Sequence, residues 1–590
     1  MFLDLAVVAG LASLGFCVTY GSIKHVPQLE WDFIIVGGGT AGSVLASRLT
    51  ENPKFNVLVI EAGPTNENAT ESIVPGLGLA HLAMSRFDWN FTTVPQKGLN
   101  NRAVTLQRGF ILGGTSSVNG MVYSRGPSSD YDRFARVTGD SGWSWDALQK
   151  YIKKNEKFEL PSDNHDIKDE FDPAVHSFSG KVAVTLPGFL SPAIDSATIQ
   201  ASNELGGDFA FNLDMNSGKP LGLGWTQSTI GHDGTRSSSA TSYLDSQTRS
   251  RKNLYIVTNT RVTRLLKTPG TKELTIRMVE IRSPDPSDPF TIFTASKEVI
   301  LSGGAIGTPH ILLHSGIGDE NDLKALNVST ILHNPSVGRN LSDHPFLPIT
   351  FGIAPGSIDL GPWVNLQTDP ALAAEALDIW NKNGTGPYVQ EMPNDHITWA
   401  RLSKDSPTLA LGDPSSGPNA PHIELIFNVI SGIFTTIMLF VTPVSRGSVT
   451  IGSNNPLDDP LIDPAYLTTE SDLPGVREGI RKALNFSKAP VWKNVITGFV
   501  GPLANATTDA EIDDVIRNGV ESGLHPVGTA AMSSRDASWG VVNPDLLVKK
   551  VSGLRIVDAS IMPYIPSAHA QVPVYLIAER AADMIKCTWR

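Results

Sequence analysis

The sequence predicts an α/β fold of more than one domain, and three features of its 590 residues point to it. A strand–glycine–helix–strand unit occupies residues 31–64. The strand–glycine–helix order returns at residues 290–314 and again near the C-terminus. From Phe346 onward the chain becomes richer in Pro, Gly and Asn, which indicates a different architecture. A chain of this length is expected to divide into two or three domains.

The first unit has the pattern of a dinucleotide-binding site. Residues 33–36 and 56–60 are short apolar runs typical of buried strands, and residues 43–50 fit a helix. The G-x-G-x-x-G turn between them would let a pyrophosphate approach the helix N-terminus, and Glu61, 19 residues after the last glycine, would reach a ribose. This motif alone does not decide which dinucleotide binds. The predicted cradle consists of Gly37, Gly39, Thr40, Ala41 and Gly42.

A second glycine-rich loop at residues 109–121 contains Gly113 and Gly114. No Lys follows its glycines, so it is not a nucleoside triphosphate P-loop. Its small residues allow close approach to a flat ligand, and Ser117 and Asn119 offer hydrogen bonds. Taken alone, the stretch fits a tight surface turn equally well.

The rest of the chain alternates between expected helices and strands. Residues 142–151 begin a charged helix and residues 162–180 form a polar loop. We expect strands at 253–265, 274–281, 290–301 and 554–558, and helices at 472–487, 509–519 and 573–584. Residues 425–444 carry no charge and are long enough to cross a bilayer, but the turn formers at 428–432 favour two buried strands.

Two histidine-containing segments are interpreted as structural. His310 and His314 have the i, i+4 spacing of metal ligands, but no Glu follows His310, and a packed helix face is favoured over a zinc site. No metal site is predicted. Asp343 and His344 are interpreted as a buried hydrogen-bonded pair rather than a catalytic one.

Composition and charge limit which binding partners and which cellular compartment fit this chain. The net charge is −12 and no Lys/Arg-rich run is present, which argues against nucleic acid as a partner. Residues 5–18 are almost wholly apolar, and their length suits a secretory signal better than a membrane span. The segment before them is irregular, with Asp4 and no Lys or Arg, so a retained anchor or a cytosolic start stays an alternative. We expect a secreted monomer with no membrane span in the mature chain.

Seven N-x-[ST] sites agree with secretion, although a chain this long also generates such sites by chance. Only Cys17 and Cys587 are present, and Cys17 would leave with the signal, so the mature chain has no internal disulfide. The acceptor asparagines are Asn68, Asn90, Asn327, Asn340, Asn383, Asn485 and Asn505.

The C-terminal part carries the candidate catalytic groups. His525 and His569 each lie in a tight loop, and 44 residues separate them, so only the fold can bring them together. No G-x-S-x-G elbow and no Cys beside a His accompany them, which argues against acyl transfer. A neutral imidazole suits a general base that removes a hydroxyl proton, although a single histidine is more often structural.

Six ordered motifs resemble the glucose-methanol-choline (GMC) oxidoreductases, which are FAD-dependent, and the resemblance covers essentially the whole chain after the expected signal. Within that family the C-terminal third looks most like fungal aryl-alcohol oxidases, notably at residues 537–546 and around His569. The motifs are DFIIVGGGTAGSVLASRL, GFILGGTSSVNGMVYSRG, GAIGTPHILLHSGIG, VGRNLSDHP, HPVGTAAM and GLRIVDASIMP.

The resemblance implies a Rossmann-like FAD-binding domain and a substrate-binding domain on an antiparallel sheet with flanking helices. It assigns residues 22–150, 222–345 and 515–590 to the first domain, residues 151–221 and 346–514 to the second, and residues 1–21 to the signal peptide. Val118 stands where some relatives carry a His bonded to flavin, so the FAD is expected to be non-covalent. Beyond the cradle and Glu61, the implied cofactor residues are Gly113, Gly114, Thr115, Ser117, Asn119, Val262, Asp558, Ala559, Ala570 and Gln571.

The implied reaction is oxidation of a primary alcohol, such as an aryl or allylic one, to an aldehyde. His525 would accept the alcohol proton while a hydride passes to flavin N5, and His569 would hydrogen-bond the substrate oxygen. Either O₂, giving H₂O₂, or a quinone would accept the electrons. The alternatives are a sugar or other alcohol dehydrogenase of the same family and a flavin-containing hydroxynitrile lyase.

The chain departs from aryl-alcohol oxidases at the substrate pocket. Gly120 and Leu524 stand where those enzymes carry aromatic residues, and the loop near residues 430–434 is short. Ring contacts are worth ~0.5–1.5 kcal/mol each. We therefore expect a wider pocket with fewer stacking contacts than in those relatives.

Overall fold

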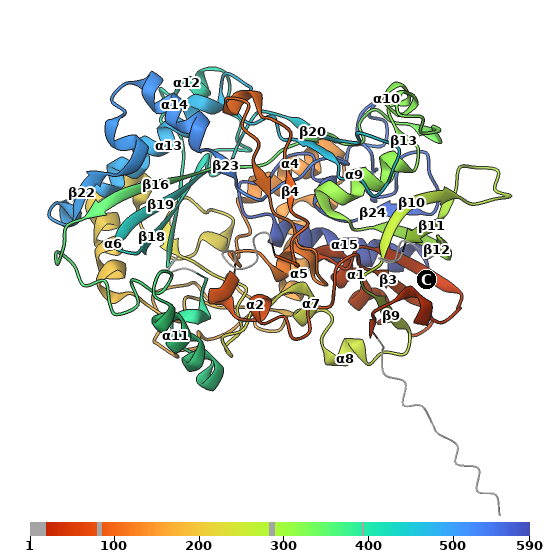
Figure 1. Cartoon of the computed structure of the whole chain (residues 1–590), viewed down its shortest axis with the longest axis horizontal. Coiled ribbons are helices and arrows are strands. Elements are labelled where there is room, and N and C mark those ends of the chain that lie inside the picture. The colour runs from red at the N-terminus through yellow and green to blue at the C-terminus, as the bar shows by residue number, and fades with distance from the viewer. Residues whose placement is uncertain (1–18, 79–84, 283–289, 392–394) are drawn as a thin grey trace, which may run out of the picture.

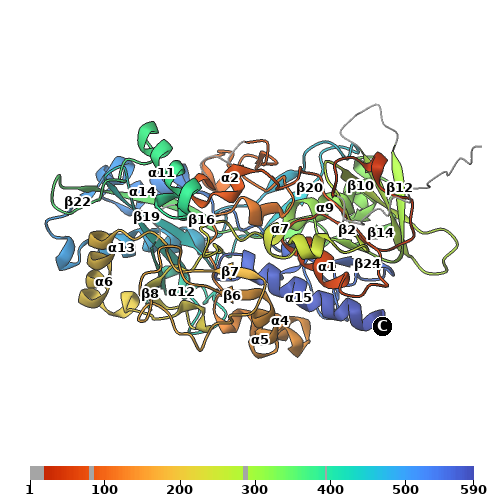
Figure 2. The ribbon, with the colours of Figure 1, turned by 90° about the horizontal axis from the view of Figure 1, so that it is seen from below.

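The computed structural model describes residues 19–78, 85–282, 290–391 and 395–590. Residues 1–18 of the predicted signal segment lie outside the described residues, whereas Thr19 and Tyr20, also assigned to it, form strand β1 and pair with β9 (Leu254–Val257). Two lobes lie side by side along the long axis of the molecule, each around its own sheet (Figure 1 and Figure 2). Within the described ranges, no helix combines the length and the apolar character that crossing a bilayer requires.

The first lobe is built on a mainly parallel sheet, which has eight strands among the described residues, in the order β1-β9-β3-β2-β12-β11-β10 with β24 also paired to β12. The first half of the long strand β12 pairs with the antiparallel β11, and its second half pairs with the parallel β2 and β24. The strands are β1 (Thr19–Tyr20), β2 (Trp31–Val36), β3 (Val57–Ile60), β9 (Leu254–Val257), β10 (Arg261–Lys267), β11 (Ile276–Arg282), β12 (Thr291–Leu301) and β24 (Leu554–Ile556).

Helices α1 and α15 pack against each other beside this sheet (Figure 2). The central strands β2 and β3 are apolar and buried apart from Asp32 near the start of β2, as expected for a parallel sheet covered on both faces. The helices of this lobe are α1 (Thr40–Leu49), α2 (Thr70–Ile73), α4 (Ser128–Thr138), α5 (Trp145–Asn155), α7 (Ser239–Ser242), α8 (Ser246–Arg249), α9 (Gly304–His314), α10 (Glu320–Ala325) and α15 (Gln571–Thr588).

The second lobe contains an antiparallel sheet in the order β22-β16-β19-β18-β17-β8, with β23 also paired to β16. Helix α13 packs on its central strands, and α14 packs on α13. The strands are β8 (Gly222–Trp225), β16 (Pro345–Ile353), β17 (His396–Ala400), β18 (Ile423–Ile430), β19 (Ile433–Phe440), β22 (Ile496–Phe499) and β23 (Glu521–Ser522). The helices are α6 (Pro192–Leu205), α11 (Pro370–Asn383), α12 (Pro407–Ala410), α13 (Asp472–Ser487) and α14 (Asp509–Gly519).

Small sheets fill the edges and the junction between the lobes. They comprise β4 (Phe91–Thr92) with β5 (Thr105–Leu106), β6 (Glu156–Phe158) with β7 (Val182–Val184), β13 (Ile317–Gly318) with β14 (Leu332–His333), and β15 (Arg339–Leu341) with β20 (Gly447–Thr450) and β21 (Leu461–Asp463).

The structure confirms the two-domain α/β prediction and most of its elements. The charge-free stretch at 425–444 forms the hairpin β18–β19, whose turn has positive φ at Ser431 and Gly432. The single strand predicted at 253–265 is wrong. The chain breaks at Asn259, which has φ +52°, and β9 and β10 lie on opposite sides of the sheet. The alternating pattern continues across the break because both strands are partly buried.

Two predicted domain boundaries need correction. Strand β8 begins at residue 222, which was assigned to the cofactor domain, yet it pairs with β17 of the second sheet. Strand β23 follows the boundary at 515, yet it pairs with β16. Strand patterning does not specify which sheet a strand joins, because that choice depends on partners distant in sequence.

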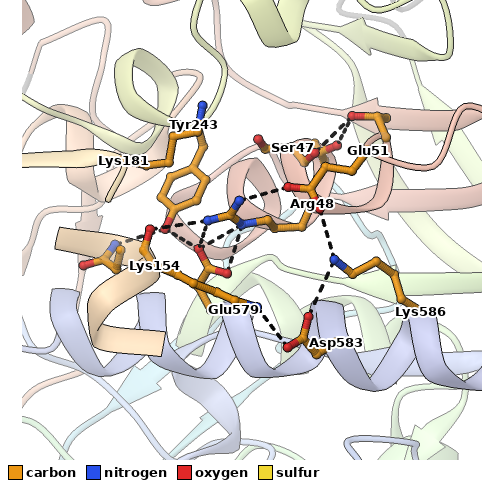
Figure 3. Close-up of polar contacts among 12 residues, drawn as sticks. Ser47, Arg48, Glu51, Lys154, Lys181, Tyr243, Glu579, Asp583 and Lys586 are labelled. Atoms are coloured by element: carbon orange, nitrogen blue, oxygen red, sulfur yellow. Dashed lines mark hydrogen bonds and ion pairs between the residues drawn. The ribbon is translucent and has the colours of Figure 1, made fainter. Parts of the chain in front are cut away.

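A cluster of ion pairs joins the C-terminal helix α15 to the neighbouring helices α1 and α5 (Figure 3). The fully buried carboxylate of Glu579 on α15 accepts hydrogen bonds from Arg48 Nε and Nη2 of α1 at 2.8–3.0 Å and from the Tyr243 hydroxyl at 2.7 Å. Around it lie the more exposed pairs Lys154–Asp583 at 3.0 Å and Lys586–Glu51 at 3.1 Å. This cluster sets the position of α15 against the cradle helix α1.

Candidate active site

The predicted dinucleotide cradle forms where β2 turns into α1. Gly37 has φ +97°, and its N–H donates to Ile60 O of the neighbouring strand at 2.8 Å. A Cβ on Gly42 would lie 2.0 Å from Gly37 O, so only glycine lets the first turn of the helix pack this closely on the strand. The N-terminus of α1 therefore faces the space beyond β2, where helix N–H groups favour an anion.

The second glycine-rich loop lies directly against this cradle. Gly113 N donates to Gly38 O at 2.8 Å. A Cβ on Gly114 would lie 2.8 Å from Gly39 Cα, so the two loops touch backbone to backbone. The glycines that make this loop a tight turn are therefore the same ones that allow close backbone approach.

Glu61 lies at the end of β3, next to the cradle. Its carboxylate accepts hydrogen bonds from Gly38 N at 2.7 Å and Gly63 N at 2.8 Å. Burial raises the pKa of Glu61 to about 7, although the backbone N–H donors oppose that rise. The carboxyl oxygens are thus fixed beside the cavity, where ribose hydroxyls would meet them.

A continuous cavity of about 1480 Å³ runs from the cradle to the junction of the lobes. Most of the predicted site residues line it: Gly37, Gly39, Thr40, Ala41, Glu61, Gly114, Thr115, Asn119, Gly120, Val262, Leu524, His525, Asp558, Ala559, His569, Ala570 and Gln571.

Three predicted cofactor residues do not line this cavity. Gly42 instead packs on the backbone of Gly37, and Gly113 packs on Ser117 and Ala240, where a Cβ would not fit. The Ser117 hydroxyl points back into its own loop, where it donates to Leu112 O at 2.9 Å, so the prediction that this side chain offers a ligand hydrogen bond needs correction. A hydroxyl that satisfies a local carbonyl is a common fate for serine in a turn.

Polar side chains hold the loop after the second glycine motif. Asn119 Nδ2 donates to Gln571 Oε1 at 2.7 Å, and Asn119 Oδ1 accepts from Arg236 Nη1 at 2.9 Å. Burial lowers the pKa of Arg236 to about 10, which still leaves it cationic near neutral pH. Asp558 accepts from Gly304 N at 2.9 Å and Thr308 Oγ1 at 2.6 Å, so it also anchors the start of α9.

The fold brings the two candidate catalytic histidines together at the cavity wall. The ring centroids of His525 and His569 lie 4.6 Å apart with an interplanar angle of 72°. His525 follows β23, and His569 immediately precedes α15. The predicted convergence of these two loops is therefore confirmed.

His525 is held by groups that the sequence analysis interpreted as structural. Its backbone N–H donates to Asp343 Oδ1 at 2.7 Å, and its Nδ1 lies 3.0 Å from Nδ1 of His344. Burial, followed by the charges of His569, His344 and Arg108, lowers the pKa of His525 well below its usual value. His525 is consequently a neutral imidazole near pH 7.

His344 is itself fully buried, and burial lowers its pKa to about 3. Since both rings are neutral, one of the two facing Nδ1 atoms carries a hydrogen and the other accepts it. A His525 Nδ1–H that donates to His344 leaves His525 Nε2 as the proton acceptor. The Asp343–His344 pair is buried and hydrogen-bonded as predicted, and it also positions the candidate base.

His569 contacts a carboxylate that the sequence analysis missed. Its Nε2 lies 2.8 Å from Oε1 of Glu424, which is fully buried in β18, and its backbone N–H donates to Ser124 Oγ at 2.9 Å. The sequence does contain a signal for this contact: Glu424 is a single carboxylate in a largely apolar strand. A buried charge needs a partner, so such a residue is expected to face a polar group.

The backbone just before His525 is unusual. Leu524 has φ +62°, a conformation that costs a non-glycine residue ~1–2 kcal/mol. Two hydrogen bonds hold it, from Leu524 N to Ser522 Oγ at 3.0 Å and from Arg108 Nη2 to Leu524 O at 2.6 Å. Arg108 thereby connects the second glycine-rich loop to the loop of the candidate base.

Gly120 and Leu524 line the cavity without rings, as expected, and aromatic residues reach it from other elements. Phe346 comes from β16, Phe427 from β18, and Trp363 and Tyr388 from the segments on either side of α11. Their presence at the cavity depends on the tertiary fold, and no local sequence motif predicts it.

His310 and His314 form a packed pair on α9. Their rings contact edge to face at 4.5 Å, and His310 Nε2 lies 3.1 Å from Asp458 O. Both are buried. Among the described residues, no group of three His, Cys, Asp or Glu side chains is placed to hold a metal ion.

The residues present fit FAD. The cradle would take a pyrophosphate at the α1 N-terminus, and Glu61 would take the adenosine ribose. The two glycine loops touch backbone to backbone beside the cavity, and a Cβ on Gly114 would disturb that contact. The histidine pair lies at the other end of the same cavity.

Comparison with known proteins agrees with this geometry. The family model described as GMC oxidoreductase matches residues 31–346 with its N-terminal part and residues 443–578 with its C-terminal part. The chain is 41% identical over 605 residues to pyranose dehydrogenase 3 of Leucoagaricus meleagris, covering 98% of this chain and 97% of that protein.

Two solved structures are similar over almost the whole chain. An FAD-dependent oxidoreductase from Chaetomium thermophilum has a TM-score of 0.86 at 30% identity, covering 95% of this chain and 100% of the other. A fungal aryl-alcohol oxidase has a TM-score of 0.83 at 26% identity, covering 95% and 99%. The likeness to aryl-alcohol oxidases is thus clear in structure, but the sequence is more similar to the pyranose dehydrogenase.

FAD is the cofactor typical of the family identified by these matches. The chain belongs to the GMC oxidoreductases and is an enzyme that acts on the CH–OH group of alcohols or sugars.

Proposed function

We propose that this protein is an FAD-dependent sugar dehydrogenase that oxidises a CH–OH group of a pyranose and passes the electrons to a quinone. The 41% identity to a pyranose dehydrogenase over almost the full length supports this choice. The primary-alcohol interpretation has less support, because the aryl-alcohol oxidase is similar at 26% identity.

The observation that carries the proposal is the neutral His525 next to His569 in the cavity wall. His525 Nε2 accepts the hydroxyl proton of the substrate as the C–H bond breaks. A positioned base of this kind is worth ~10²–10⁴ in rate.

His569 orients the substrate oxygen. Its contact with the fully buried carboxylate of Glu424 fixes the orientation of the ring. A ring held in one orientation hydrogen-bonds the substrate oxygen without having to reorganise.

FAD would supply the two-electron acceptor for the hydride released from the carbinol carbon. We propose that it is bound without a covalent bond, because Val118 carries no nucleophile. Acid precipitation of the purified protein tests this. FAD released into the supernatant supports the proposal, and a yellow precipitate contradicts it.

The substrate is tested by mixing the purified protein anaerobically with D-glucose, other pyranoses and benzyl alcohol. We expect the pyranoses to bleach the flavin absorbance faster than benzyl alcohol. Reoxidation by benzoquinone should be faster than by O₂. A flavin that benzyl alcohol alone reduces would restore the aryl-alcohol interpretation, and one that nothing reduces would point to a lyase.

The role of His525 is tested with His525→Ala. The variant should retain FAD and lose flavin reduction by ~10²-fold or more. A variant reduced as fast as the wild-type protein would rule out His525 as the base.

We also propose that the protein is secreted and glycosylated. Six of the seven sequon asparagines are exposed, which suits glycosylation, whereas the Asn340 amide is bound to Gly528 O and Pro563 O. Endoglycosidase treatment of protein from a fungal culture medium should lower its mass. Unchanged mass, or protein found only inside the cells, would contradict the proposal.

A further inference from the structure

A cluster of buried charges adjoins the segment that holds His569, and the proposed reaction does not use it. The cluster consists of Arg125, Glu156, His176 and Asp214, and at most 3% of each side chain is exposed. Arg125 lies shortly before α4, Glu156 starts β6, and the other two come from loops. Charges buried this deeply are tolerated only where they balance one another.

Both ring nitrogens of His176 face carboxylate oxygens. Nδ1 lies 2.8 Å from Glu156 Oε1, and Nε2 lies 2.6 Å from Asp214 Oδ2. A neutral imidazole has one N–H and one lone pair, so it would point that lone pair at one of the two carboxylates. Only the imidazolium donates to both at once. The geometry therefore requires a protonated His176.

Charge balance leads to the same conclusion. Arg125 Nη2 donates to Glu156 Oε2 at 2.6 Å, so the cluster contains two carboxylates and one guanidinium. A cationic His176 brings the sum to zero, whereas a neutral one leaves an uncompensated negative charge in a buried site. Tyr123 is a further ionisable group here, with its ring 6.0 Å from the Arg125 guanidinium, and burial raises its pKa so that it stays neutral.

The pKa of His176 follows the same partners. Burial lowers this pKa, but the hydrogen bonds to Asp214 and Glu156 outweigh burial and raise it above its usual value. The rings of Phe158 and Phe171 pack against the imidazole at centroid distances of 4.4 and 5.7 Å. They close the site to water and leave the two carboxylates as the groups that stabilise the proton.

The cluster holds the segment at residues 121–125. Arg125 Nη1 donates to Val175 O and to Asn216 O, each at 3.0 Å, and its backbone N–H donates to Asn216 Oδ1 at 2.6 Å. Asp214 fixes Asn216 in turn, because Asn216 N donates to Asp214 Oδ1 at 2.9 Å. Asn216 Nδ2 also donates to Tyr123 O at 3.1 Å. The position of the segment thus depends on the charges next to His176.

This segment is part of the candidate active site. Ser124 lies within it, and its hydroxyl oxygen accepts the backbone N–H of His569 at 2.9 Å. Met121 and Val122 of the same segment line the cavity. A shift of residues 121–125 would therefore move both His569 and part of the cavity wall.

We propose that His176 is a positioning residue for the reaction: as an imidazolium it holds residues 121–125, and through Ser124 the backbone of His569, in the reactive arrangement. Loss of its second proton releases that arrangement. The inference rests on the proposed role of His569 and not on the choice of substrate.

The direction of the pH effect follows from the form that the fold favours. Because the folded protein raises the pKa of His176, the contribution of the imidazolium is complete below pH 6.5 and is lost as the pH rises through the raised value. The rate of flavin reduction should accordingly fall on the alkaline side. Anaerobic stopped-flow mixing from pH 6 to 10 measures it, with whichever of the pyranoses or benzyl alcohol reduces the flavin. Return of the protein to pH 6.5 should restore the rate.

Two variants separate the charge of His176 from its shape. His176→Gln leaves the cluster with a net negative charge at every pH, so flavin reduction at pH 6.5 should slow ~10- to 100-fold with FAD still bound. Glu156→Gln balances the charge with a neutral His176. Its amide oxygen accepts from Arg125 and from Ser177 N, and its amide N–H donates to His176 Nδ1. This variant should keep the wild-type rate at pH 6.5 and lose the alkaline decline.

His165 provides a matched control in the same loop. Its ring also faces two carboxylates, Asp163 Oδ1 at 2.6 Å and Glu170 Oε2 at 3.1 Å, but 18% of its side chain is exposed and both partners lie in that loop. His165→Gln should therefore leave the rate and its pH profile unchanged. Urea unfolding at pH 6.5 and 9.5 adds a measurement that needs no substrate: the wild-type protein should lose stability between the two values, and Glu156→Gln should not.

Three results would overturn the inference: a wild-type rate that stays constant up to pH 10, a His176→Gln variant as fast as wild type at pH 6.5, or an alkaline decline that persists unchanged in Glu156→Gln. Reduction by benzyl alcohol and by no pyranose would overturn the proposed function instead, and the same variants would then be compared with benzyl alcohol.

Discussion

At the scale of single residues, the two candidate catalytic histidines differ in what holds them. His525 Nδ1 faces the imidazole of His344, its backbone N–H donates to the buried Asp343 carboxylate, and it lies near the cationic Arg108. The Nε2 of His569 instead faces the fully buried carboxylate of Glu424. Two identical side chains thus have different partners, which suits them to different roles.

The first prediction concerns the pH dependence of the reaction. The base must be neutral, and the pKa of His525 is lowered mainly by burial. kcat/KM should therefore stay constant as the pH falls through 6.5 and decline only well below it. Steady-state assays between pH 4 and 8 check this. A decline centred at pH 6.5 or above would show that another group titrates.

The second prediction concerns Glu424. Glu424→Gln keeps the size of the side chain and removes the charge opposite His569. Flavin reduction by substrate should slow ~10–100-fold, since a hydrogen bond to a charged group is worth ~1.5–3 kcal/mol. Stopped-flow reduction measures the rate, and the visible spectrum checks that FAD stays bound.

The exposed Glu204 on α6 provides the control, because Glu204→Gln should leave the rate unchanged. Equal rates for Glu424→Gln and wild type would remove Glu424 from the mechanism.

At the scale of elements, the helix that follows His569 is fixed by a buried ion pair. Glu579 of α15 is fully buried and is bound by Arg48 of α1, the helix of the cradle (Figure 3). The same contact thus orients the cradle and the helix behind the substrate-facing histidine. Breaking a buried pair by removing one partner leaves an uncompensated charge.

The third prediction follows from this pair. Arg48→Met should lower the free energy of unfolding by ~3 kcal/mol, because Glu579 then keeps the Tyr243 hydroxyl but loses the guanidinium that balances its buried charge. The double variant Arg48→Met/Glu579→Leu should recover most of the loss. Urea unfolding followed by far-UV circular dichroism measures both.

The exposed pair Arg481–Asp509 is the comparison, and Arg481→Met should change stability by less than ~0.5 kcal/mol. Similar losses of unfolding free energy in Arg48→Met and Arg481→Met would show that burial does not make the Arg48–Glu579 pair more important than an exposed pair.

At the scale of the whole molecule, several histidines are buried in the neutral form. Burial lowers the pKa of His310, His344 and His396 to about 3 each. Below pH 6.5 the unfolded chain binds protons that the folded protein does not. Stability is therefore lost as the pH falls from 6.5 toward 3.

The fourth prediction uses His310 on α9, which is not part of the histidine pair. His310→Asn cannot titrate, so its stability should fall less steeply with acid than that of the wild type. Below pH 6.5 the slopes of unfolding free energy against pH should differ between the two proteins by about 1 kcal/mol per pH unit. Urea unfolding at pH 7.5, 6.5 and 5.5 gives the slopes, and parallel slopes would contradict the neutral burial of His310.

Much of the fold follows from local patterns, because a strand, a turn or a helix is encoded in adjacent residues. The strands around the cradle, the β18–β19 hairpin and helices α13 and α14 are found where the sequence predicts them. The same local pattern includes the glycines of the cradle and the carboxylate of Glu61, which lie close together in the sequence. The sequence by itself determined the cofactor domain, the cradle and the identity of the two histidines.

The tertiary structure decided what those residues contact. It brought His525 to His569, turned the Ser117 hydroxyl away from the cavity, and placed β8 and β23 in the second sheet. It also placed Glu424 and His344 beside the catalytic candidates. Each of these depends on which strands pair and in what register, and pairing joins residues whose separation in sequence carries no local signal.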